Sequence, residues 1–402
     1  MLAMYTRRLE LPTRSFLLLG PRGTGKTTWL RAHLAGARWY NLLLDREHLR
    51  LLRDPGLFRR EIAALPAGAW VVVDEVQRLP ALLNEVHDAL AAAPRRWRFA
   101  LTGSSARRLR RGNANLLAGR VISRQMYPLT LAELRSRPPV DDLLRFGGLP
   151  LVRTERALAT RIDLLEAYVD TYLTQEVRAE ALVRSLESFT RFLEVAALAN
   201  GQVTNVTGLA RDAAVARPTV QGYFEVLTDT LLGTWLPAWR PRAKVKEAQH
   251  PKFYLFDCGV VRALSRRLRE PVEGAERGNL LETLVLNELR AHMTYAGCGG
   301  ALSYYRTPSG TEVDFIWTRG RHSIGIEVKA SRQWRPEYGR ALRELRASET
   351  LTQCHAVYLG DTPQQDGSVS VRPLFAFLDA LSAGRILPSA PLTRRQRPPA
   401  AP

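Results

Sequence analysis

The stretch GPRGTGKT, residues 20–27, constrains this chain more than any other part of it. It follows the apolar run SFLLLG and precedes a stretch of helical character, so we expect a turn between a strand and a helix. Glycines in such a turn let backbone N–H groups surround a phosphate chain at the helix amino terminus. A chance glycine-rich turn is the alternative, but the full pattern in this context predicts a nucleoside triphosphate site.

Every position of this loop is expected to contribute to nucleotide binding. Lys26 would place a positive charge on the γ-phosphate, and Thr27 would offer its hydroxyl group to Mg²⁺. ATP and Mg²⁺ are therefore the expected cofactors. The predicted nucleotide-binding residues of the loop are Gly20, Pro21, Arg22, Gly23, Thr24, Gly25, Lys26, Thr27 and Thr28.

Polar side chains end two further apolar runs. In WVVVDEVQRLP, Asp74 is expected to hold Mg²⁺ through water, and Glu75 to orient and deprotonate the attacking water. The run FALTGSSARRL places Thr102 or Ser104 beside the γ-phosphate. Ligands of parallel α/β sheets bind at the carboxyl ends of the strands, so these side chains are predicted to meet the phosphate loop.

The arrangement of apolar runs predicts an α/β fold for residues 1–135. SFLLLG, RWYNLLLD, AWVVVDE and WRFALTGSS are nearly continuous apolar runs separated by helical stretches, which is typical of a parallel sheet covered on both faces. RVISRQMYPLT could add a fifth strand. The turn-rich stretch RSRPPVDDLLRFGGLP marks a boundary, after which residues 136–200 are expected to form a helical lid or linker.

Residues 201–262 are similar to a winged helix-turn-helix. Pro218 can begin a helix whose apolar positions follow at helical spacing, and a shorter apolar face precedes it. A basic hairpin is expected next, with cations at every second position that would suit phosphate contacts: Arg240, Arg242, Lys244 and Lys246. Winged helices also dock proteins, so the segment alone leaves both DNA and protein as partners.

The hairpin RTPSGTEVDFIWTRGRHSIGIEVKA, residues 306–330, carries charges that a packed core does not need. On a strand, Glu327 and Lys329 point to the same side, and Asp314 of the neighbouring strand can lie beside them. Two converging carboxylates repel unless a cation separates them, and oxygen ligands favour Mg²⁺. Lys329 could then position a water or neutralise charge on a phosphate. The structural alternative is a Glu-Lys ion pair on an exposed strand.

This D…ExK pattern resembles the PD-(D/E)xK nuclease superfamily. The element order also matches: a helix at 279–293, three strands within 301–330, a helix at 337–349 and a strand at 354–360. The resemblance implies that Asp314 and Glu327 are metal ligands and that Lys329 is the catalytic lysine. It also implies that Glu282, on the apolar face of the helix, is an accessory ligand. Val313 stands where the superfamily name has proline.

Charge and cysteine content narrow the range of partners. The 58 Lys and Arg residues exceed the 39 Asp and Glu residues by 19, which suggests a polyanionic partner, although a genome rich in arginine codons would have the same effect. Three isolated cysteines argue against a zinc site or a disulfide framework. Since no apolar run approaches the roughly 20 residues that span a bilayer, we expect a soluble cytoplasmic protein without a membrane partner.

The whole chain resembles a prokaryotic family of AAA+-type ATPases with a C-terminal domain of unknown function. Motifs carrying the likeness include GPRGTGKTT, VVDEVQRLP, LTGSSARRL, LAGR, FGGLP, YLFDCGVV, LLETLVLNELR and YRTPSGTEVDFIW. The likeness implies an α/β P-loop domain, a helical middle with a winged helix and a nuclease-like α/β domain at 263–385. The Pro-rich, basic composition of residues 386–402 predicts a disordered tail. It also implies that Arg120 completes a neighbour's active site, which requires a homo-oligomer.

Three hypotheses follow for the function. The first is an ATP-driven enzyme that remodels or migrates branched or duplex DNA, such as a Holliday junction, and cuts it at the C-terminal site. The second is a DNA-dependent motor whose nuclease-like domain only binds. The third is a regulatory or signalling NTPase in which the ATP state gates DNA binding. DNA-stimulated hydrolysis would separate the first two from the third.

Overall fold

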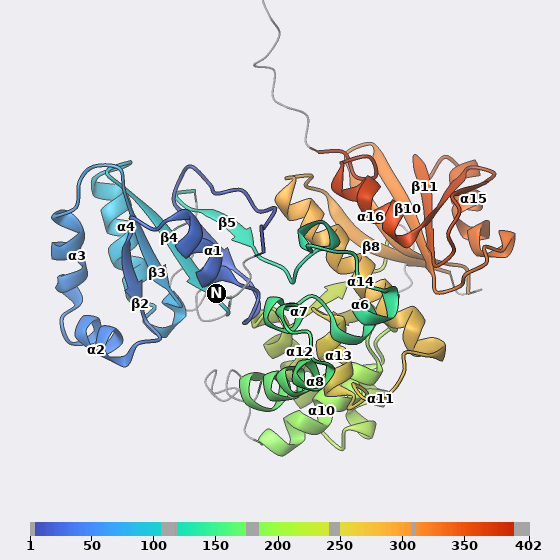
Figure 1. Ribbon diagram of the computed structural model, residues 1–402, viewed down its shortest axis with the longest axis horizontal. Helices are drawn as coiled ribbons and strands as arrows, with labels where there is room; N and C mark the ends of the chain where they lie inside the picture. Colours follow the sequence, from blue (N-terminus) through green and yellow to red (C-terminus); the bar gives the residue numbers. More distant parts are fainter. Residues whose placement is uncertain are drawn as a thin grey trace, which may run out of the picture. The chain divides into compact units, whose positions relative to one another are not determined.

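The computed structural model describes residues 5–105, 117, 119–173, 185–240, 250–307 and 310–389. The chain divides into two compact units, the first comprising residues 1–237 and 248–287, the second residues 238–247 and 288–402. Each unit contains its own extended sheet (Figure 1).

The main sheet of the first unit has five parallel strands in the order β2-β3-β4-β1-β5. This confirms the predicted parallel sheet, including its fifth strand. Because all strands run the same way, their carboxyl ends share one edge, which brings the loop after β1 and the acids after β3 together. The strands are β1 Phe16–Leu19, β2 Arg38–Asn41, β3 Ala69–Asp74, β4 Trp97–Gly103 and β5 Ile122–Gln125.

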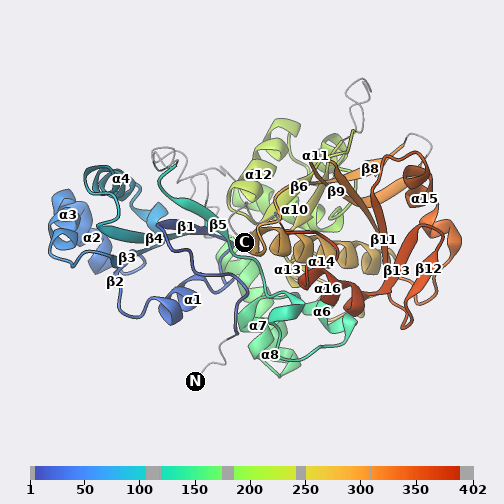
Figure 2. The same ribbon diagram turned by 90° about the horizontal axis from the view of Figure 1, so that it is seen from above.

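Helices cover both faces of this sheet, as Figure 2 shows with α1 and α4 on opposite sides. On one face, Val71, Val73 and Phe99 form a buried cluster with apolar side chains of α2, α3 and α4. On the other, Trp29 of α1 meets Phe16 edge to face. The helices are α1 Lys26–His33, α2 Asp45–Arg53, α3 Pro55–Ala63 and α4 Leu82–Ala92.

Strand β2 is shorter than its apolar run suggested. The run RWYNLLLD extends to residue 45, but the strand ends at Asn41, whose side chain accepts a hydrogen bond from the Leu43 backbone at 3.0 Å. This local bond turns the chain into α2, and Leu43 and Leu44 become exposed. Apolar composition alone did not reveal the turn.

The rest of the first unit is mostly helical. Helix α6 was not predicted. It lies between Pro139 and Gly147, inside the stretch whose sequence indicated turns. Its final residue, Phe146, is buried, so tertiary packing outweighs the local turn signals. The elements are η3 Leu131–Glu133, α6 Val140–Phe146, α7 Pro150–Thr154, α8 Leu158–Ala167, η4 Tyr168–Leu173 and α10 Leu186–Leu198.

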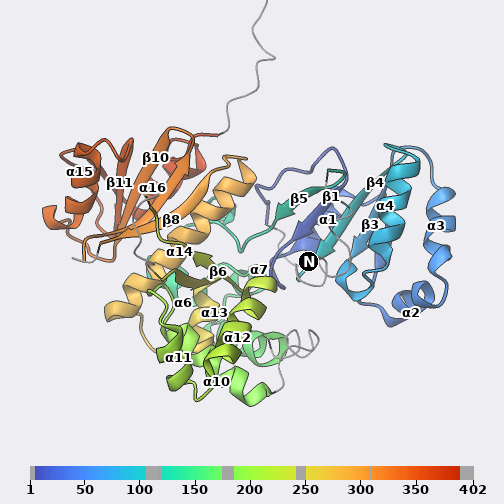
Figure 3. The same cartoon turned by 180° about the vertical axis from the view of Figure 1, so that it is seen from behind.

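The segment similar to a winged helix contains the expected helix, turn and helix: α11 Val206–Asp212 and α12 Arg217–Asp229, which lie side by side (Figure 3). Strands β6 Gly233–Leu236 and β7 Lys252–Leu255 then pair antiparallel. Of the basic residues expected between them, Arg240 is exposed, whereas Arg242, Lys244 and Lys246 lie outside the described residues.

Two of the sequence motifs, FGGLP and YLFDCGVV, contact each other in this unit. Asp257, which caps α13 Cys258–Leu264, accepts a 2.6 Å hydrogen bond from the Gly148 backbone N–H. Gly147 has φ 64°, and a β-carbon there would lie 1.9 Å from the Asp257 carboxylate. Burial raises the pKa of Asp257. The FGGLP and YLFDCGVV motifs therefore pack against each other, and the contact leaves no room for a side chain larger than that of glycine at position 147.

The second unit contains a six-stranded sheet in the order β12-β13-β11-β10-β9-β8. The element order expected from the sequence is confirmed through β11, while β12, β13 and α16 were not anticipated. Helix α14 Gly274–Tyr295 begins in the first unit and ends in the second. The others are β8 Ala301–Arg306, β9 Glu312–Arg319, β10 His322–Lys329, η5 Pro336–Gly339, α15 Arg340–Ala347, β11 Gln353–Tyr358, β12 Gln364–Asp366, β13 Val369–Pro373 and α16 Leu374–Ser382.

Packing in the second unit places α15 on the sheet face that carries Cys354 and Ala356. The three cysteines of the chain are free and buried. Within the described part of the chain, no helix has the length and apolar character needed to cross a membrane.

The buried His355 of β11 predicts an acid-sensitive second unit. Burial, reinforced by Arg372, lowers the pKa of His355 to about 4 from 6.5. Below pH 6.5 the unfolded chain therefore binds a proton that the folded chain does not bind. We expect the free energy of unfolding to fall by about 3 kcal/mol as the pH drops from 6.5 to 4.

Urea unfolding of His355→Gln should show a shallower loss of stability than the wild type between about pH 7 and pH 4.5. His322→Gln, at an exposed position of β10, is the matched control and should keep the wild-type slope. Equal slopes for His355→Gln and the wild type would contradict the prediction.

Candidate functional site

The loop between β1 and α1 has the backbone shape that phosphate binding requires. Gly25 caps α1 with φ 92°, a conformation that residues with a β-carbon rarely adopt. The backbone turn directs the amino terminus of α1 toward the carboxyl edge of the sheet, where a phosphate chain would meet its N–H groups. The loop predicted from its glycines is therefore formed.

Lys26, Thr27 and Asp74 converge at this loop. The Lys26 ammonium is buried and donates to the carbonyl oxygens of Gly20 and Pro21, at 2.7 and 3.1 Å. The Thr27 hydroxyl donates to both carboxylate oxygens of Asp74, at 3.1 and 2.9 Å. These two oxygen-bearing side chains are those predicted to hold Mg²⁺, and their contact fits that ion.

Asp74 is fully buried at the end of β3. Burial raises the pKa of its carboxyl group, although hydrogen bonds from Thr102 and Thr27 oppose that effect. The Thr102 hydroxyl donates to Asp74 at 2.5 Å and accepts from the Glu75 backbone N–H at 2.9 Å. Thr102, predicted as a phosphate sensor, is thus tied to the two acidic residues of the site.

Glu75 occupies a left-handed backbone conformation with φ 60° and ψ 48°. Its carboxylate accepts hydrogen bonds from the Gln77 amide and from the Ser104 hydroxyl, the latter at 3.3 Å. The structure therefore brings Glu75 and Ser104 together, as expected. Gln77 was missed by sequence reasoning, because a glutamine one turn after a strand carries no distinctive signal.

Residues outside the motif hold the phosphate loop in place. Arg7 donates to the carbonyl oxygens of Thr24 and Tyr127, at 3.3 and 2.5 Å, and lies 3.2 Å from the Glu133 carboxylate. The Tyr168 hydroxyl donates to the Arg22 carbonyl at 3.1 Å. None of these contacts follows from the local sequence, since the partners are more than 100 residues apart or belong to segments with no motif.

Two further residues predicted for the site are exposed to solvent. Thr28 is exposed on the first turn of α1. Arg120 is exposed in the turn before β5, and its role toward a neighbouring subunit stays a prediction. Residues 106–116, which precede it, lie outside the described residues.

In the second unit, Asp314, Glu327 and Lys329 come together on neighbouring strands. Continuing the antiparallel register of β9 and β10 by one residue past Ile326 places Asp314 opposite Glu327. The Lys329 ammonium bonds to the Glu327 carboxylate and lies 4.0 Å from that of Asp314. Asp314 also accepts from the Val328 backbone N–H at 2.8 Å. The structure thus assembles the three charges as the sequence predicted.

This cluster offers two buried carboxylates, each 4% exposed, beside a lysine whose side chain is 31% exposed. Magnesium sites commonly use one or two carboxylates, with waters and substrate phosphates completing the shell, so the donor set fits Mg²⁺. Among the described residues, no group of three or more His, Cys, Asp or Glu side chains is placed to hold a metal.

Glu282, the predicted accessory ligand, has partners in the first unit. Its carboxylate accepts a 2.8 Å hydrogen bond from the Tyr254 hydroxyl and lies 3.4 Å from the Lys252 ammonium. This explains how a carboxylate is accommodated on the apolar side of α14. Its role as a metal ligand stays a prediction.

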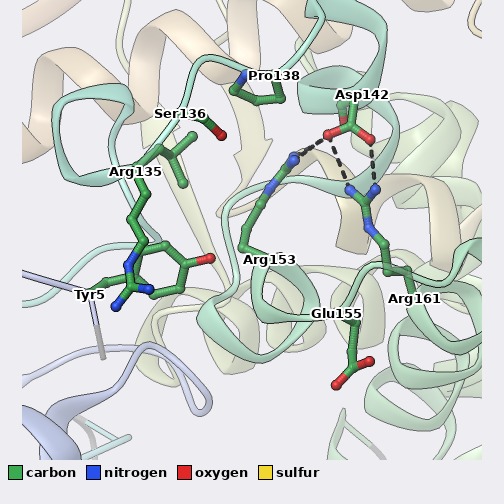
Figure 4. A pocket seen from close by; sticks show the side chains of 9 residues that line it. Tyr5, Arg135, Ser136, Pro138, Asp142, Arg153, Glu155 and Arg161 are labelled. Carbon is green, nitrogen blue, oxygen red and sulfur yellow. Dashed lines mark hydrogen bonds and ion pairs between the residues drawn. The ribbon is translucent and has the colours of Figure 1, made fainter. Parts of the chain in front are cut away.

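A polar pocket of about 160 Å³ opens in the helical middle of the first unit (Figure 4). Asp142 is one of its lining residues and accepts from both Arg153 and Arg161. Its carboxylate offsets one of the two guanidinium charges and Glu155 adds a second carboxylate to the lining, so the pocket resembles an internal ion-pair network more than an anion site.

Family models match three consecutive stretches of the chain. Residues 12–135 match an AAA domain, residues 137–270 match a domain of unknown function (DUF8612), and residues 277–377 match another (DUF4143). The first of these matches agrees with the phosphate loop and its acids.

Three bacterial proteins are similar to this chain in sequence over much of its length. Uncharacterised proteins of Mycobacterium bovis and Mycobacterium tuberculosis are each 28% identical over 366 residues, covering 88% of this chain and 79% of the relative. An uncharacterised protein of Haemophilus influenzae is 26% identical over 245 residues, covering 57% of this chain and 58% of its own.

Solved structures give weaker matches. A RuvB protein of Thermotoga maritima aligns with a TM-score of 0.29 at 17% identity, over 56% of this chain and 82% of its own. A Vibrio cholerae protein aligns with a TM-score of 0.21 at 10% identity, over 92% and 96%. Scores this low support no inference. Residues 12–135 are similar to an AAA domain and carry the geometry of a P-loop ATPase, which is the conclusion that the site and the family match support together.

Proposed function

We propose that this protein is an ATP-driven motor that processes DNA and cuts it at a Mg²⁺-dependent site in the second unit. One observation supports the proposal: a phosphate loop with Thr27, Asp74 and Glu75 beside it and an Asp-Glu-Lys cluster occur in one polypeptide. The first set supplies energy, and the second has the chemistry of phosphodiester cleavage.

The ATPase part of the proposal rests on four residues. Lys26 would neutralise phosphate charge, Thr27 and Asp74 would hold Mg²⁺, and Glu75 would orient and deprotonate the attacking water. Arg120, exposed ahead of β5, would complete the site of a neighbouring subunit in a homo-oligomer. Bound Mg²⁺ would offset negative charge on the phosphates.

DNA is the proposed substrate because its phosphates match the charge of the chain. The net charge of +19 favours a polyanion, and the helix-turn-helix formed by α11 and α12 is followed by the strand pair β6–β7. A winged helix of this kind would contact DNA phosphates. A motor joined to a nuclease suits branched DNA such as a Holliday junction, in which migration and cutting are successive steps.

The nuclease part rests on the second unit. Its helix-strand-strand-strand-helix-strand order and the Asp314, Glu327 and Lys329 cluster support a PD-(D/E)xK-like site. Asp314 and Glu327 would hold Mg²⁺, with Glu282 as an accessory ligand, and Lys329 would stabilise charge on the phosphate. The competing function is an ATP-gated DNA-binding regulator, favoured by the ion pair that Lys329 forms with Glu327.

The first test is ATP hydrolysis measured with no DNA and with single-stranded, duplex and four-way DNA in parallel. We expect DNA to raise the turnover number, with the largest effect from four-way or duplex DNA. Binding should weaken at least about tenfold between about 50 and 200 mM salt, because released counterions drive association with phosphates. Equal turnover under all four conditions, together with no DNA binding at low salt, would contradict the proposal.

A further inference from the structure

Gln77 is a buried glutamine within the VVDEVQRLP motif, and the sequence analysis assigned it no role. It lies in the single turn η1 Val76–Arg78, directly after β3, and is 7% exposed. Its amide nitrogen donates to Glu75 Oε2 and, at 3.1 Å, to the Ser104 hydroxyl. The Ser104 hydroxyl in turn donates to the same Glu75 oxygen at 3.3 Å. Gln77 and Ser104 therefore hold one carboxylate oxygen from two sides.

The amide oxygen of Gln77 indicates that packing alone does not explain this residue. Within the described part of the chain, that buried oxygen has no hydrogen-bond partner. A buried acceptor without a partner lowers stability, so an apolar side chain of similar length would suit the core better. A glutamine at this position is explained if its amide nitrogen is needed to bind the Glu75 carboxylate.

The backbone around Glu75 cannot orient the carboxylate alone. The left-handed conformation of Glu75 and its N–H bond to Thr102 fix where the side chain starts. The remaining side-chain torsions are free unless the carboxylate is held at its far end. With Oε2 occupied by Gln77 and Ser104, the second oxygen is the one available to a water molecule.

We propose that Gln77 is a positioning residue for Glu75 in ATP hydrolysis. It holds Oε2, together with Ser104, so that the other carboxylate oxygen accepts a proton from the water that attacks the γ-phosphate. The new bond joins the water oxygen to phosphorus, the bond to the leaving ADP oxygen breaks, and the water proton passes to Glu75. This inference rests on the ATPase activity proposed above and assigns a role to a residue that the sequence analysis left without one.

The test replaces Gln77 by methionine, which keeps the length of the side chain and removes the donor. We expect kcat for ATP hydrolysis to fall by about 10- to 100-fold, since a small misplacement of a catalytic group has an effect of this size. The dissociation constant of a fluorescent ATP analogue should change less than about twofold, because Gln77 holds Glu75 and not the phosphate loop. Gln202→Met, an exposed position of the same residue type, is the matched control.

A double-mutant cycle separates positioning from a general structural effect. In Glu75→Gln the carboxylate is absent, so adding Gln77→Met should lower the remaining rate by less than about twofold. The same 10- to 100-fold decrease in both backgrounds would overturn the inference, and so would an unchanged kcat for Gln77→Met. If Gln77→Met does not fold by thermal unfolding, Gln77→Asn keeps the polarity and shortens the side chain by one methylene, and the same outcomes apply.

The outcome also distinguishes this inference from the proposed function. A wild-type protein that hydrolyses ATP, loses activity in Lys26→Ala and is unaffected by Gln77→Met would refute only the role of Gln77. A wild-type protein with no ATP hydrolysis would refute both.

Discussion

Replacing Lys26 by alanine is expected to lower kcat/KM for ATP hydrolysis by about 10²- to 10³-fold, with or without DNA. The Lys26 ammonium is buried at the phosphate loop, where it bonds to the Gly20 and Pro21 carbonyl oxygens. At this position its positive charge would stabilise the β- and γ-phosphates of bound ATP. In the dry environment of the loop, a positive charge stabilises phosphate oxygens more strongly than in water. Steady-state ATPase kinetics measure the effect.

Arg31→Ala is the matched control for this experiment. Arg31 is an exposed cation on the same helix, α1, so its removal changes the net charge equally without changing the site. We expect the control to keep wild-type kcat and KM. Hydrolysis by Lys26→Ala at the wild-type rate would show that the phosphate loop is not the catalytic site.

Asp314→Asn and Glu327→Gln are each expected to abolish Mg²⁺-dependent nicking of branched DNA, with a decrease of at least about 10³-fold. Each change keeps the size of the side chain but removes a negative charge, and two carboxylates are needed to hold the divalent ion against water. ATP hydrolysis should continue at the wild-type rate, because the phosphate loop belongs to the other unit. Gel analysis of nicked four-way DNA measures the first effect.

Glu344→Gln controls for the loss of charge, since Glu344 pairs with Arg340 on the exposed side of α15 and lies outside the cluster. It should nick DNA at the wild-type rate. A wild-type protein whose ATPase responds to DNA but which never nicks it would assign the cluster to binding instead of cutting. Nicking that survives both substitutions would place the nuclease activity elsewhere.

Much of the fold was predictable because its signals are local. Four of the five parallel strands of the first unit lie in short apolar runs separated by helices, a pattern typical of a sheet covered on both faces, whereas the edge strand β5 is largely polar. The D…ExK hairpin was predictable for a similar reason, since the two-residue period of a strand decides which charges share a face. The turn after Asn41 and helix α6 were not predicted, because a single hydrogen bond in the first case and three buried apolar side chains in the second outweighed composition.

The candidate site was predictable where contiguous residues form it and was not where distant residues meet. Arg7 and Tyr168 contact the phosphate loop through contacts that depend on how segments pack. Gln77 is only two residues from Glu75, but its contact depends on the conformation of the turn after β3, which the sequence did not reveal. Glu282 illustrates the same limit, because its apolar-face position was apparent but its partners Tyr254 and Lys252 were not.

By itself, the sequence determined that this protein has a phosphate loop, a pair of acids after an apolar strand and a charged hairpin, because backbone geometry and side-chain period act over a few residues. Only the tertiary structure decided that Gln77 and Ser104 share the Glu75 carboxylate, and that Asp257 joins the FGGLP turn to α13. The contacts of Ser104 with Glu75 and of Asp257 with Gly148 join segments far apart along the chain, and close packing of the folded protein selects such partners.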